Sequence, residues 1–494
     1  MKLSIIKTFT FLLAGGLLFT ACGDDFLDRQ PIDQIDSQNF FRTESDMNSA
    51  TLAIYTAMQS QQFFGESWRI EETPSDDSRQ NFGAAIDNFT ATANDGEVIN
   101  YWSGHYRVVT LSNVVIEKTP GADISPGKQD TIIAEARFLR ALAYYNLVRV
   151  YGGVPIITAI PTLEDDLLYP RSSVDEVYDF IKADLEFAAD HLPLTTPKGR
   201  ATSGAANAYL ASVHLTLREY EQARDRSRRV IDSGVYALMP SYGDLWIYDA
   251  GNENNAESIF EIQYTGCEAW GTGNPRQAFF APWNQGITKG TDGWGSLLPT
   301  DPTIDQPNTT AVDIWEEGDE RRYWSMMEPG NYYPDINAAT DGGYTYPMDG
   351  AGGAARNIRK YVMGGGNDVC FMSTPQNGSL MRYSEVLLIY AEALAELSNG
   401  ITLNQEALEL VNGLRTRAGV EPLEFLDSET IELERRREFM FEGKRWFDIL
   451  RKGTEEAVLL MRLHGRTLDE TRLLFPLPAS ELEINPNLTQ NPGY

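Results

Sequence analysis

Apolar residues recur at helical spacing along much of the chain. Between residues 130 and 151 they come at steps of three and four, the spacing of one helix face. The positions are Ala134, Phe138, Ala141, Tyr145 and Val148. Glycines and a proline within 152–155 end this predicted helix. Similar patterns predict a helix over 201–231, another over 383–397 and a further one that begins near 402 or 404.

Alanines alternate with tyrosines and leucines on these predicted helices. Small residues beside large ones are what closely stacked helix pairs require. The pattern resembles tetratricopeptide-type hairpins, although no strict repeat of about 34 residues is present. The hairpins are far apart in the chain, which excludes a continuous solenoid. We therefore predict a mainly α fold, in which helical hairpins form one scaffold with long insertions.

One long insertion is visible in the sequence. From about residue 246 to 378 the chain is rich in Gly, Pro, Asn, Asp and aromatic residues, and it has few periodic segments. Residues 257–262 alternate as a strand does, and paired glycines mark turns. Long irregular segments on a rigid scaffold are often where ligands bind. We predict a loop-rich, aromatic-rich lobe that carries the binding function.

Composition and charge narrow the class of protein. The 494 residues are 42% hydrophobic and 23% charged, which is ordinary globular usage and excludes a disordered chain. Lys plus Arg number 41 against 71 Asp plus Glu, giving a formal net charge of -30. Such an acidic surface repels phosphate backbones and anionic lipids. We predict that the chain binds no nucleic acid and has no basic membrane-binding patch.

The first residues have the features of a secretory signal peptide. Lys2 and Lys7 precede an apolar run from Phe9 to Phe19, and this run is shorter than the roughly 20 residues that span a bilayer. The alternative is a buried N-terminal helix or strand. Residues 19–22 (FTAC) resemble a bacterial lipobox. That resemblance implies that Cys22 is acylated and becomes the first residue of a lipid-tethered mature protein.

The other two cysteines leave one question open. Three cysteines are too few for a disulfide scaffold. Cys267 and Cys370 are able to form one bridge in an oxidising compartment, and the sequence does not decide whether they do.

Several short segments, in a fixed order, resemble one family. They are 26–31 (FLDRQP), 134–141 (AEARFLRA), 151–155 (YGGVP), 434–439 (ERRREF), 441–448 (FEGKRWFD), 475–478 (FPLP) and 490–494 (QNPGY). Together they resemble the SusD/RagB family of surface lipoproteins, and they extend over essentially the whole chain after Cys22. The resemblance divides the chain into a signal peptide (1–21), an N-terminal helical region (22–235) and a C-terminal region (236–494). The C-terminal region contains the insertion and the final helices, and both regions form one compact body.

The resemblance implies a non-catalytic function. Members of this family capture an oligomeric nutrient, typically a glycan, at the outer surface of a Gram-negative outer membrane. They pass it to a SusC-like TonB-dependent transporter, whose extracellular opening they cover. Asp24 and Asp25 resemble the acidic signal that sends such lipoproteins to the outer leaflet. We therefore expect a lipid-anchored outer-membrane protein that faces the cell exterior.

The block from 434 to 451 has a physical interpretation of its own. Glu434, Glu438 and Glu442 are spaced four residues apart and arginines surround them. Like charges at this spacing destabilise an isolated helix, so we predict ion pairs with other segments. A catalytic role as acid and base is the alternative. It is disfavoured because neighbouring arginines keep carboxylates ionised and leave no proton donor near neutral pH.

Other motifs of catalysis or metal binding are missing from the sequence. The four histidines have no metal-ligand spacing, and no metalloprotease, redox, nucleophile-elbow or phosphate-loop motif occurs. Paired glycosidase carboxylates have no sequence signature, so this class stays open. Asp335, Asn337, Asp341 and Gly342 offer oxygens to calcium, but their spacing departs from the EF-hand loop. We predict no cofactor and no metal site.

Aromatic residues mark the candidate ligand site. Trp270, Trp283 and Trp294 fall within 25 residues of the predicted insertion. A second set combines rings with polar neighbours and consists of Trp68, Asp77, Arg79, Asn81 and Tyr101. Sugar rings pack on flat aromatic faces, while their hydroxyls need polar groups at the rim. The alternative is that these rings are the buried cores of long loops.

Three functions therefore compete. Glycan binding is favoured by the aromatic residues and by the family resemblance. A peptide-binding member of the same family is the second, since the sequence does not separate the two ligands. A surface glycoside hydrolase is the third. Family binding residues vary, so the resemblance assigns no individual ligand contact here.

Overall fold

The computed structural model describes most of the chain after the predicted signal peptide. The described residues are 40–83, 85–160, 168–248, 253–266, 273–283, 285–287, 293–303, 305, 309–336, 342–363 and 373–494. Cys22, Cys267, Cys370 and Trp270 lie outside them. Acylation of Cys22, a bridge between Cys267 and Cys370, and ligand binding by Trp270 therefore stay predictions.

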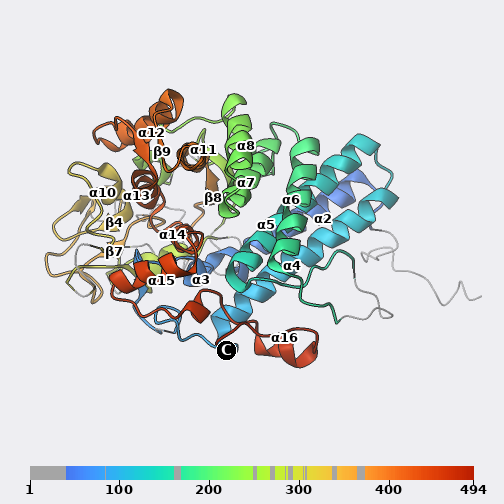
Figure 1. The fold of residues 1–494 in the computed structure, drawn as a ribbon, viewed down its shortest axis with the longest axis horizontal. Helices are drawn as coiled ribbons and strands as arrows, with labels where there is room; N and C mark the ends of the chain where they lie inside the picture. Colours follow the sequence, from blue (N-terminus) through green and yellow to red (C-terminus); the bar gives the residue numbers. More distant parts are fainter. Residues whose placement is uncertain are drawn as a thin grey trace, which may run out of the picture.

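Long helices dominate the N-terminal half (Figure 1). They are α2 (Glu44–Met58), α4 (Gly96–Lys118), α5 (Pro126–Tyr151), α6 (Val174–His191), α7 (Ser203–Thr216) and α8 (Tyr220–Asp232). From α4 to α8 each helix packs on the next one along the chain. The prediction of a mainly α fold is confirmed.

The predicted helix over 201–231 is two helices. α7 ends at Thr216 and α8 begins at Tyr220. Between them Arg218 has a φ of 58°, a left-handed conformation that an α-helix does not continue through. The break turns the chain, so that α8 packs on α7 and also on the C-terminal helix α11 (Tyr383–Leu397).

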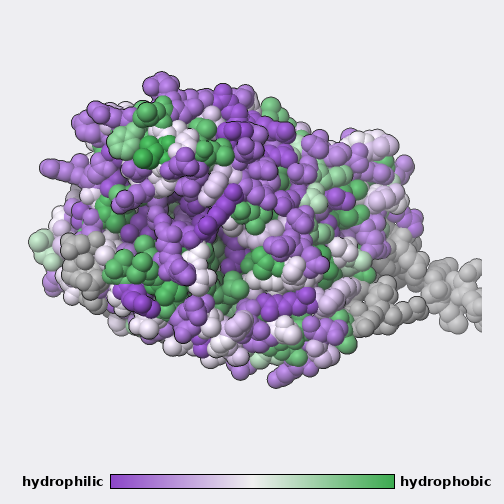
Figure 2. Space-filling view, viewed as in Figure 1, coloured by the Kyte–Doolittle hydropathy of each residue, from purple (hydrophilic) through white to green (hydrophobic). Residues whose placement is uncertain are grey.

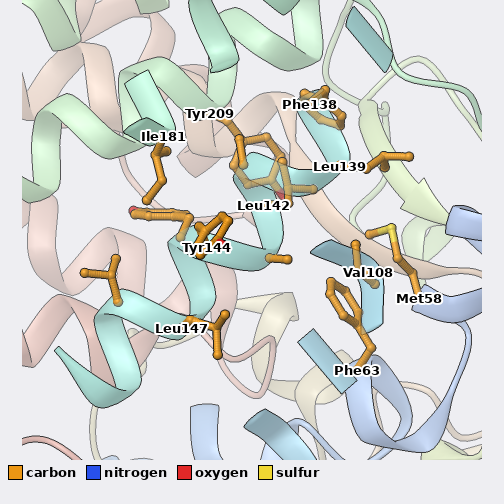
Figure 3. Close-up of a cluster of buried hydrophobic side chains, with 14 of the residues drawn as sticks. Met58, Phe63, Val108, Phe138, Leu139, Leu142, Tyr144, Leu147, Ile181 and Tyr209 are labelled. Atoms are coloured by element: carbon orange, nitrogen blue, oxygen red, sulfur yellow. The ribbon is translucent and has the colours of Figure 1, made fainter. Parts of the chain in front are cut away.

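Helix α5 lies in the middle of the largest hydrophobic core (Figure 3). Its side chain Phe138 is fully buried and packs edge-on against Tyr209 of α7, with ring centroids 5.7 Å apart. Burial of one such side chain contributes roughly 1.5–3 kcal/mol. This core extends in sequence from Met47 to Leu488. The N-terminal helices and the C-terminal segment are therefore parts of one packed body.

The C-terminal helices follow the irregular region. They are α11, α12 (Gln405–Ala418), α13 (Ser428–Phe439), α14 (Arg445–Leu450), α15 (Thr454–Leu463) and α16 (Ala479–Ile484). The strand pair β9 (Ile401–Thr402) and β10 (Leu426–Asp427) lies beside α11. Gly443 has a φ of 75°, which lets the chain turn between α13 and α14.

The irregular lobe is built from short antiparallel strand pairs and short helices. The pairs are β1 (Ser78–Gln80) with β3 (Leu297–Pro299), β2 (Ser258–Ile262) with β8 (Gly378–Arg382), β4 (Met326–Met327) with β7 (Asn357–Ile358), and β5 (Tyr332–Tyr333) with β6 (Tyr344–Thr345). The helices are α3 (Trp68–Glu71), α9 (Arg276–Phe280) and α10 (Glu320–Ser325). β2 confirms the strand that the sequence predicts.

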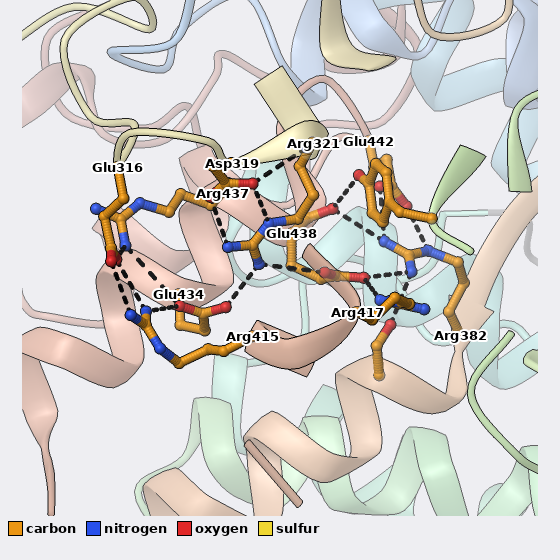
Figure 4. A network of polar contacts seen from close by, with 12 residues as sticks. Glu316, Asp319, Arg321, Arg382, Arg415, Arg417, Glu434, Arg437, Glu438 and Glu442 are labelled. Carbon is orange, nitrogen blue, oxygen red and sulfur yellow. Dashed lines mark hydrogen bonds and ion pairs between the residues drawn. The ribbon is translucent and has the colours of Figure 1, made fainter. Parts of the chain in front are cut away.

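Arginines from several elements neutralise a row of buried carboxylates on α13 (Figure 4). Glu438 accepts hydrogen bonds from Arg382 at 2.8 Å and from Arg417 at 2.6 Å. Glu434 pairs with Arg321 at 2.6 Å. These arginines belong to β8, α12 and α10, so the network joins the lobe to the helices. The predicted ion pairs between this block and other segments are confirmed.

The molecular surface is largely polar. Figure 2 shows polar residues over most of the visible face, with apolar residues in separate small groups. Within the described ranges, no helix combines the length and the hydropathy that crossing a bilayer requires.

Candidate functional site

Three residues of the predicted N-terminal set are inside the molecule. Trp68 is 1% exposed and belongs to the core of the lobe. Asp77 accepts a hydrogen bond from Arg436 at 2.6 Å. Tyr101 donates to Glu71 at 2.9 Å, and burial together with this carboxylate holds the pKa of Tyr101 well above its usual value. Trp68 and Asp77 serve packing and charge pairing, which corrects the prediction that they form a ligand surface. Tyr101 is buried as well, but it also lines a polar pocket next to Arg69.

The other two residues of that set lie at the edge of the lobe. Arg79 is half-buried on β1, with its Nε 4.0 Å from a carboxylate oxygen of Asp305. Asn81 follows β1 directly, and its backbone N–H donates to the carbonyl of Ser296 at 2.9 Å. Both polar side chains therefore lie next to the segment that carries Trp294.

The two described tryptophans of the insertion differ in exposure. Trp283 follows α9 and is 53% exposed. Trp294 is half-buried, and its ring meets that of Phe279 edge-on at 4.9 Å. Trp270 lies outside the described residues. Trp283 is therefore largely accessible to solvent, while Trp294 is accessible only in part.

Backbone hydrogen bonds hold these residues in one region. Ser296 donates to the carbonyl of Phe279 at 2.7 Å, and Gly295 donates to that of Ala281 at 2.8 Å. Trp283 itself forms a bridge with Gly293. The end of β1, the segment after α9 and the segment before β3 are thus joined side by side.

Close backbone approach explains the glycines around Trp283. A Cβ atom added at Gly293 would lie 2.2 Å from the carbonyl oxygen of Ala281. A Cβ atom added at Gly352, whose φ is +62°, would lie 2.6 Å from the backbone nitrogen of Trp283. Only glycine fits these contacts without a backbone shift.

Sequence reasoning missed two residues of this region. Phe82 is 58% exposed and directly follows Asn81. Arg69 lies with its guanidinium 4.5 Å from the ring of Trp68 and pairs with Glu66 at 2.6 Å. A large apolar residue beside Asn and Gly in a turn was the available signal for Phe82. We define the aromatic face as Arg69, Arg79, Asn81, Phe82, Trp283 and Trp294.

A small polar pocket adjoins Arg69. Its volume is about 180 Å³, and it opens between the turn before α3 and the first turn of α4. The polar residues that line it are Gln61, Gln62, Glu66, Ser67, Arg69, Glu97, Asn100 and Tyr101. Amides, carboxylates and a guanidinium suit a ligand rich in hydroxyl groups.

Tyrosines in the insertion are mostly structural. Tyr333 and Tyr346 are fully buried. Tyr332 is 51% exposed, but its hydroxyl donates to the carbonyl of Gly342 and so ties the β5–β6 pair together.

The calcium hypothesis gains no support from the described residues. Asp335 pairs with Arg359 at 2.6 Å, whereas Asn337 and Asp341 lie outside the described residues. In the described part of the chain, no group of three or more His, Cys, Asp or Glu side chains is arranged to hold a metal ion.

Two of the buried carboxylates, Glu442 and Glu72, are poorly placed for acid–base chemistry on a substrate. Burial alone would raise the pKa of Glu442, but Arg382 and Lys360 outweigh it and keep that pKa below its usual value. Burial and the charge of Asp77 raise the pKa of Glu72 to about 8. Glu72 is nevertheless completely inaccessible to solvent. Its proton is therefore not available to a bound substrate.

Comparison with known proteins identifies the family. The model of the SusD family matches residues 256–494. A second model, described as starch-binding and associating with the outer membrane, matches residues 25–215. The chain belongs to the SusD/RagB family. A SusD-like protein of Bacteroides ovatus is 32% identical over 461 residues, which cover 88% of this chain and 80% of that protein.

Solved structures of the SusD/RagB family share the fold. One crystal structure, determined with a xylogluco-oligosaccharide, is 27% identical and has a TM-score of 0.78, covering 89% of this chain and 97% of that chain. Surface glycan-binding protein A from Bacteroides fluxus is 26% identical with a TM-score of 0.75, covering 92% of this chain and 100% of that chain. The likeness therefore extends over helices and lobe together.

Proposed function

We propose that this chain binds an oligosaccharide or polysaccharide on the aromatic face without cleaving it. The observation that carries the proposal is the exposure of Trp283, whose backbone forms a bridge with Gly293 next to Trp294. Asn81 is hydrogen-bonded to Ser296 in the same segment, and the exposed Phe82 follows Asn81. Flat rings pack against the C–H faces of sugars, and polar side chains bond the hydroxyls. The backbone bonds around Trp283 hold this face in place before ligand arrives, which lowers the entropic cost of binding.

The polar pocket beside Arg69 supplies a second set of contacts. A glycan lying on the rings can direct one sugar unit into this pocket, where Gln61, Glu97 and Asn100 face it. Two relatives of similar length support a glycan as the ligand. One has been solved with a xylogluco-oligosaccharide, and the other is described as a surface glycan-binding protein.

The proposal includes where the protein works. A lipid on Cys22 anchors the chain to the outer membrane with the lobe facing the exterior. The bound glycan then passes to a SusC-like TonB-dependent transporter, which the protein covers. The family model that describes association with the outer membrane supports this placement. Purification of the tagged lipoprotein from its native membrane tests it, and the absence of a co-purifying TonB-dependent transporter would contradict the partnership.

Calorimetric titration tests glycan binding. The chain from residue 23 onward contains the whole described core, and it is titrated with xyloglucan and β-glucan oligosaccharides and with oligopeptides. Heat with a glycan and no new reducing ends is the expected result. Heat with peptides alone would assign the site to peptides, and released sugars would make the protein a hydrolase.

Variants locate the binding site. We expect Trp283→Ala to weaken glycan binding roughly tenfold or more, since loss of a stacking ring removes about 1–2 kcal/mol. Leu403→Ala is the matched control, because Leu403 is 76% exposed but lies between β9 and α12. Equal affinities of the Trp283→Ala and Leu403→Ala variants would remove Trp283 from the site.

A further inference from the structure

A sizeable cavity lies away from the aromatic face. It has a volume of about 620 Å³, which is in the range of small-molecule sites. It lies between the end of α5, the start of α6, the α14–α15 turn and the C-terminal segment around residues 470–492. None of its lining residues belongs to the aromatic face, so its ligand is independent of the glycan proposal.

The walls of this cavity are mainly apolar. Val174 and Tyr178 of α6, Phe447 and Leu450 of α14, and Leu473 and Leu474 of the C-terminal segment line it. Thr216, Thr454 and Thr471 also line the cavity, but most of its wall is apolar. Asn491 is already engaged, because its amide donates to the carbonyls of Tyr151 and Phe475. The cavity therefore suits an apolar molecular body.

One cation at this cavity, Arg149, forms no ion pair within 4 Å in the described part of the chain, although, against the effect of burial, Glu71 is near enough to help raise its pKa. The guanidinium of Arg149 lies between the rings of Tyr145 and Phe447, at 3.9 and 3.8 Å from their centroids. It donates from Nε to the carbonyl of Tyr145 at 3.1 Å and from Nη2 to the side-chain oxygen of Asn146 at 2.6 Å. Both acceptors are neutral. Across the described ranges, no carboxylate lies within ion-pair distance of Arg149, and its Nη1 makes no hydrogen bond.

The other charged residues of the lining behave differently. Arg451 is neutralised by Glu392 and Asp448. Glu470 is exposed at the mouth of the cavity, where it disfavours a second negative charge on a ligand. Among the described residues that line the cavity, the rigidly held guanidinium of Arg149 is thus the cation that no carboxylate contacts directly.

We propose that this cavity binds a small amphipathic carboxylic acid carrying one negative charge. Its carboxylate pairs with the Arg149 guanidinium through Nη1, and its apolar body packs against Leu450, Leu473 and Leu474. A guanidinium–carboxylate pair is strong in an apolar setting. Two ring contacts and two hydrogen bonds already hold Arg149, so little freedom is lost on binding.

The test compares acids with their neutral amides on the chain from residue 23 onward. Octanoate and octanamide represent an aliphatic body, and 3-phenylpropanoate and 3-phenylpropanamide represent an aromatic one. We expect at least one acid to bind tenfold or more tightly than its amide by calorimetry. Equal binding of acid and amide in both pairs, or no binding of either acid up to its solubility limit, would overturn the proposal.

Two variants and a control tie the binding to this cavity. Val174 is 40% exposed at the cavity mouth, so Val174→Trp blocks the cavity without overfilling the core and should weaken acid binding at least tenfold. Leu459→Trp, at a 56% exposed position of α15 outside the lining, should leave it unchanged. Arg149→Met should make acid and amide bind alike. Wild-type acid affinity in Val174→Trp, with glycan binding intact, would exclude this cavity.

Discussion

At the scale of single residues, tertiary packing determines whether a tryptophan is part of the core or is exposed at the surface. Trp68 and Trp446 are each 1% exposed and fill the interior, whereas Trp283 is 53% exposed. The backbone of Trp283 packs against Gly352 so closely that a Cβ atom at Gly352 would lie 2.6 Å from the Trp283 nitrogen. This contact fixes the stretch of chain that carries the exposed ring.

We expect Gly352→Ala to weaken glycan binding about as much as Trp283→Ala does, because the new Cβ must displace the Trp283 backbone. Gly353→Ala is the matched control. Gly353 has a φ of +82°, so alanine is strained there as well, but no heavy atom lies within 4 Å of the added Cβ. Calorimetry of both variants measures the difference. Similar affinities for the two would show that backbone strain, and not the contact with Trp283, controls the site.

Glu72 gives a prediction on pH dependence. Its pKa is raised to about 8 by burial and by the charge of Asp77. The folded protein therefore keeps this proton up to about pH 8, while the unfolded chain releases it near pH 4.5. The contribution of Glu72 to the free energy of unfolding is fully present below pH 4.5 and is lost as pH rises towards 8. At about 1.4 kcal/mol per pKa unit, the loss is a few kcal/mol.

Glu72→Gln does not titrate and should escape this loss. We expect its Tm to rise relative to the wild type between pH 5 and pH 8, as measured by thermal unfolding at several pH values. The exposed Glu424→Gln is the control and should show a constant difference. A Tm difference between Glu72→Gln and wild type that does not change with pH would contradict the raised pKa.

The sequence identified candidate residues for the site but did not predict which of them are exposed and which are buried. Arg79, Asn81, Trp283 and Trp294 lie in neighbouring segments and stay candidate site residues, whereas Trp68 from the same prediction is buried. Burial of one ring and exposure of another depend on contacts between segments more than 200 residues apart, such as the packing of Trp68 on Phe279. Periodicity along one segment carries no information on such contacts.

At the scale of elements, α13 depends on charges that other elements supply. Glu438 is completely buried and lies among arginines of β8, α12 and α10. Burial would raise the pKa of Glu438, but Arg417, Arg382 and Arg321 outweigh it and keep the pKa far below its usual value. Removing one partner from such a network leaves buried charges uncompensated.

We expect Glu438→Gln to destabilise the protein by roughly 3–5 kcal/mol, the usual effect of breaking a buried ion pair. Denaturant unfolding at neutral pH measures the change. Glu429→Gln is the matched control in the same helix, because Glu429 is exposed in the first turn. A loss below about 1 kcal/mol for Glu438→Gln would mean that the network contributes specificity and little stability.

The sequence predicts some helix ends and misses others. The glycines after Tyr151 predicted the end of α5, and Asn404 predicted the start of α12, whose first turn it caps. The break between α7 and α8 was missed because the residue with positive φ is Arg218, a type that gives no turn signal. Its guanidinium donates to the carbonyls of Arg451 and Lys452, so tertiary contacts stabilise the turn.

At the scale of the whole molecule, the first and last segments of the described chain are joined. Arg466 donates to the carbonyl of Thr73 at 3.1 Å, and the backbone of Phe475 donates to the carbonyl of Val150 at 2.8 Å. The family motifs in the sequence predicted that the N-terminal and C-terminal regions form one compact body. They did not predict these contacts, because the two ends are separated by the entire insertion.

This joining predicts that the protein unfolds as one unit. Leu477 is fully buried in the core that also contains α4 and α5. We expect Leu477→Ala to destabilise by roughly 2–5 kcal/mol and to reduce hydrogen-exchange protection in α5 and α11 by the same free energy. Leu463→Ala, at a 60% exposed position, should change neither helix. If protection in Leu477→Ala falls only near the C-terminus, the N-terminal helices are stable without it, and the shared core does not make folding cooperative.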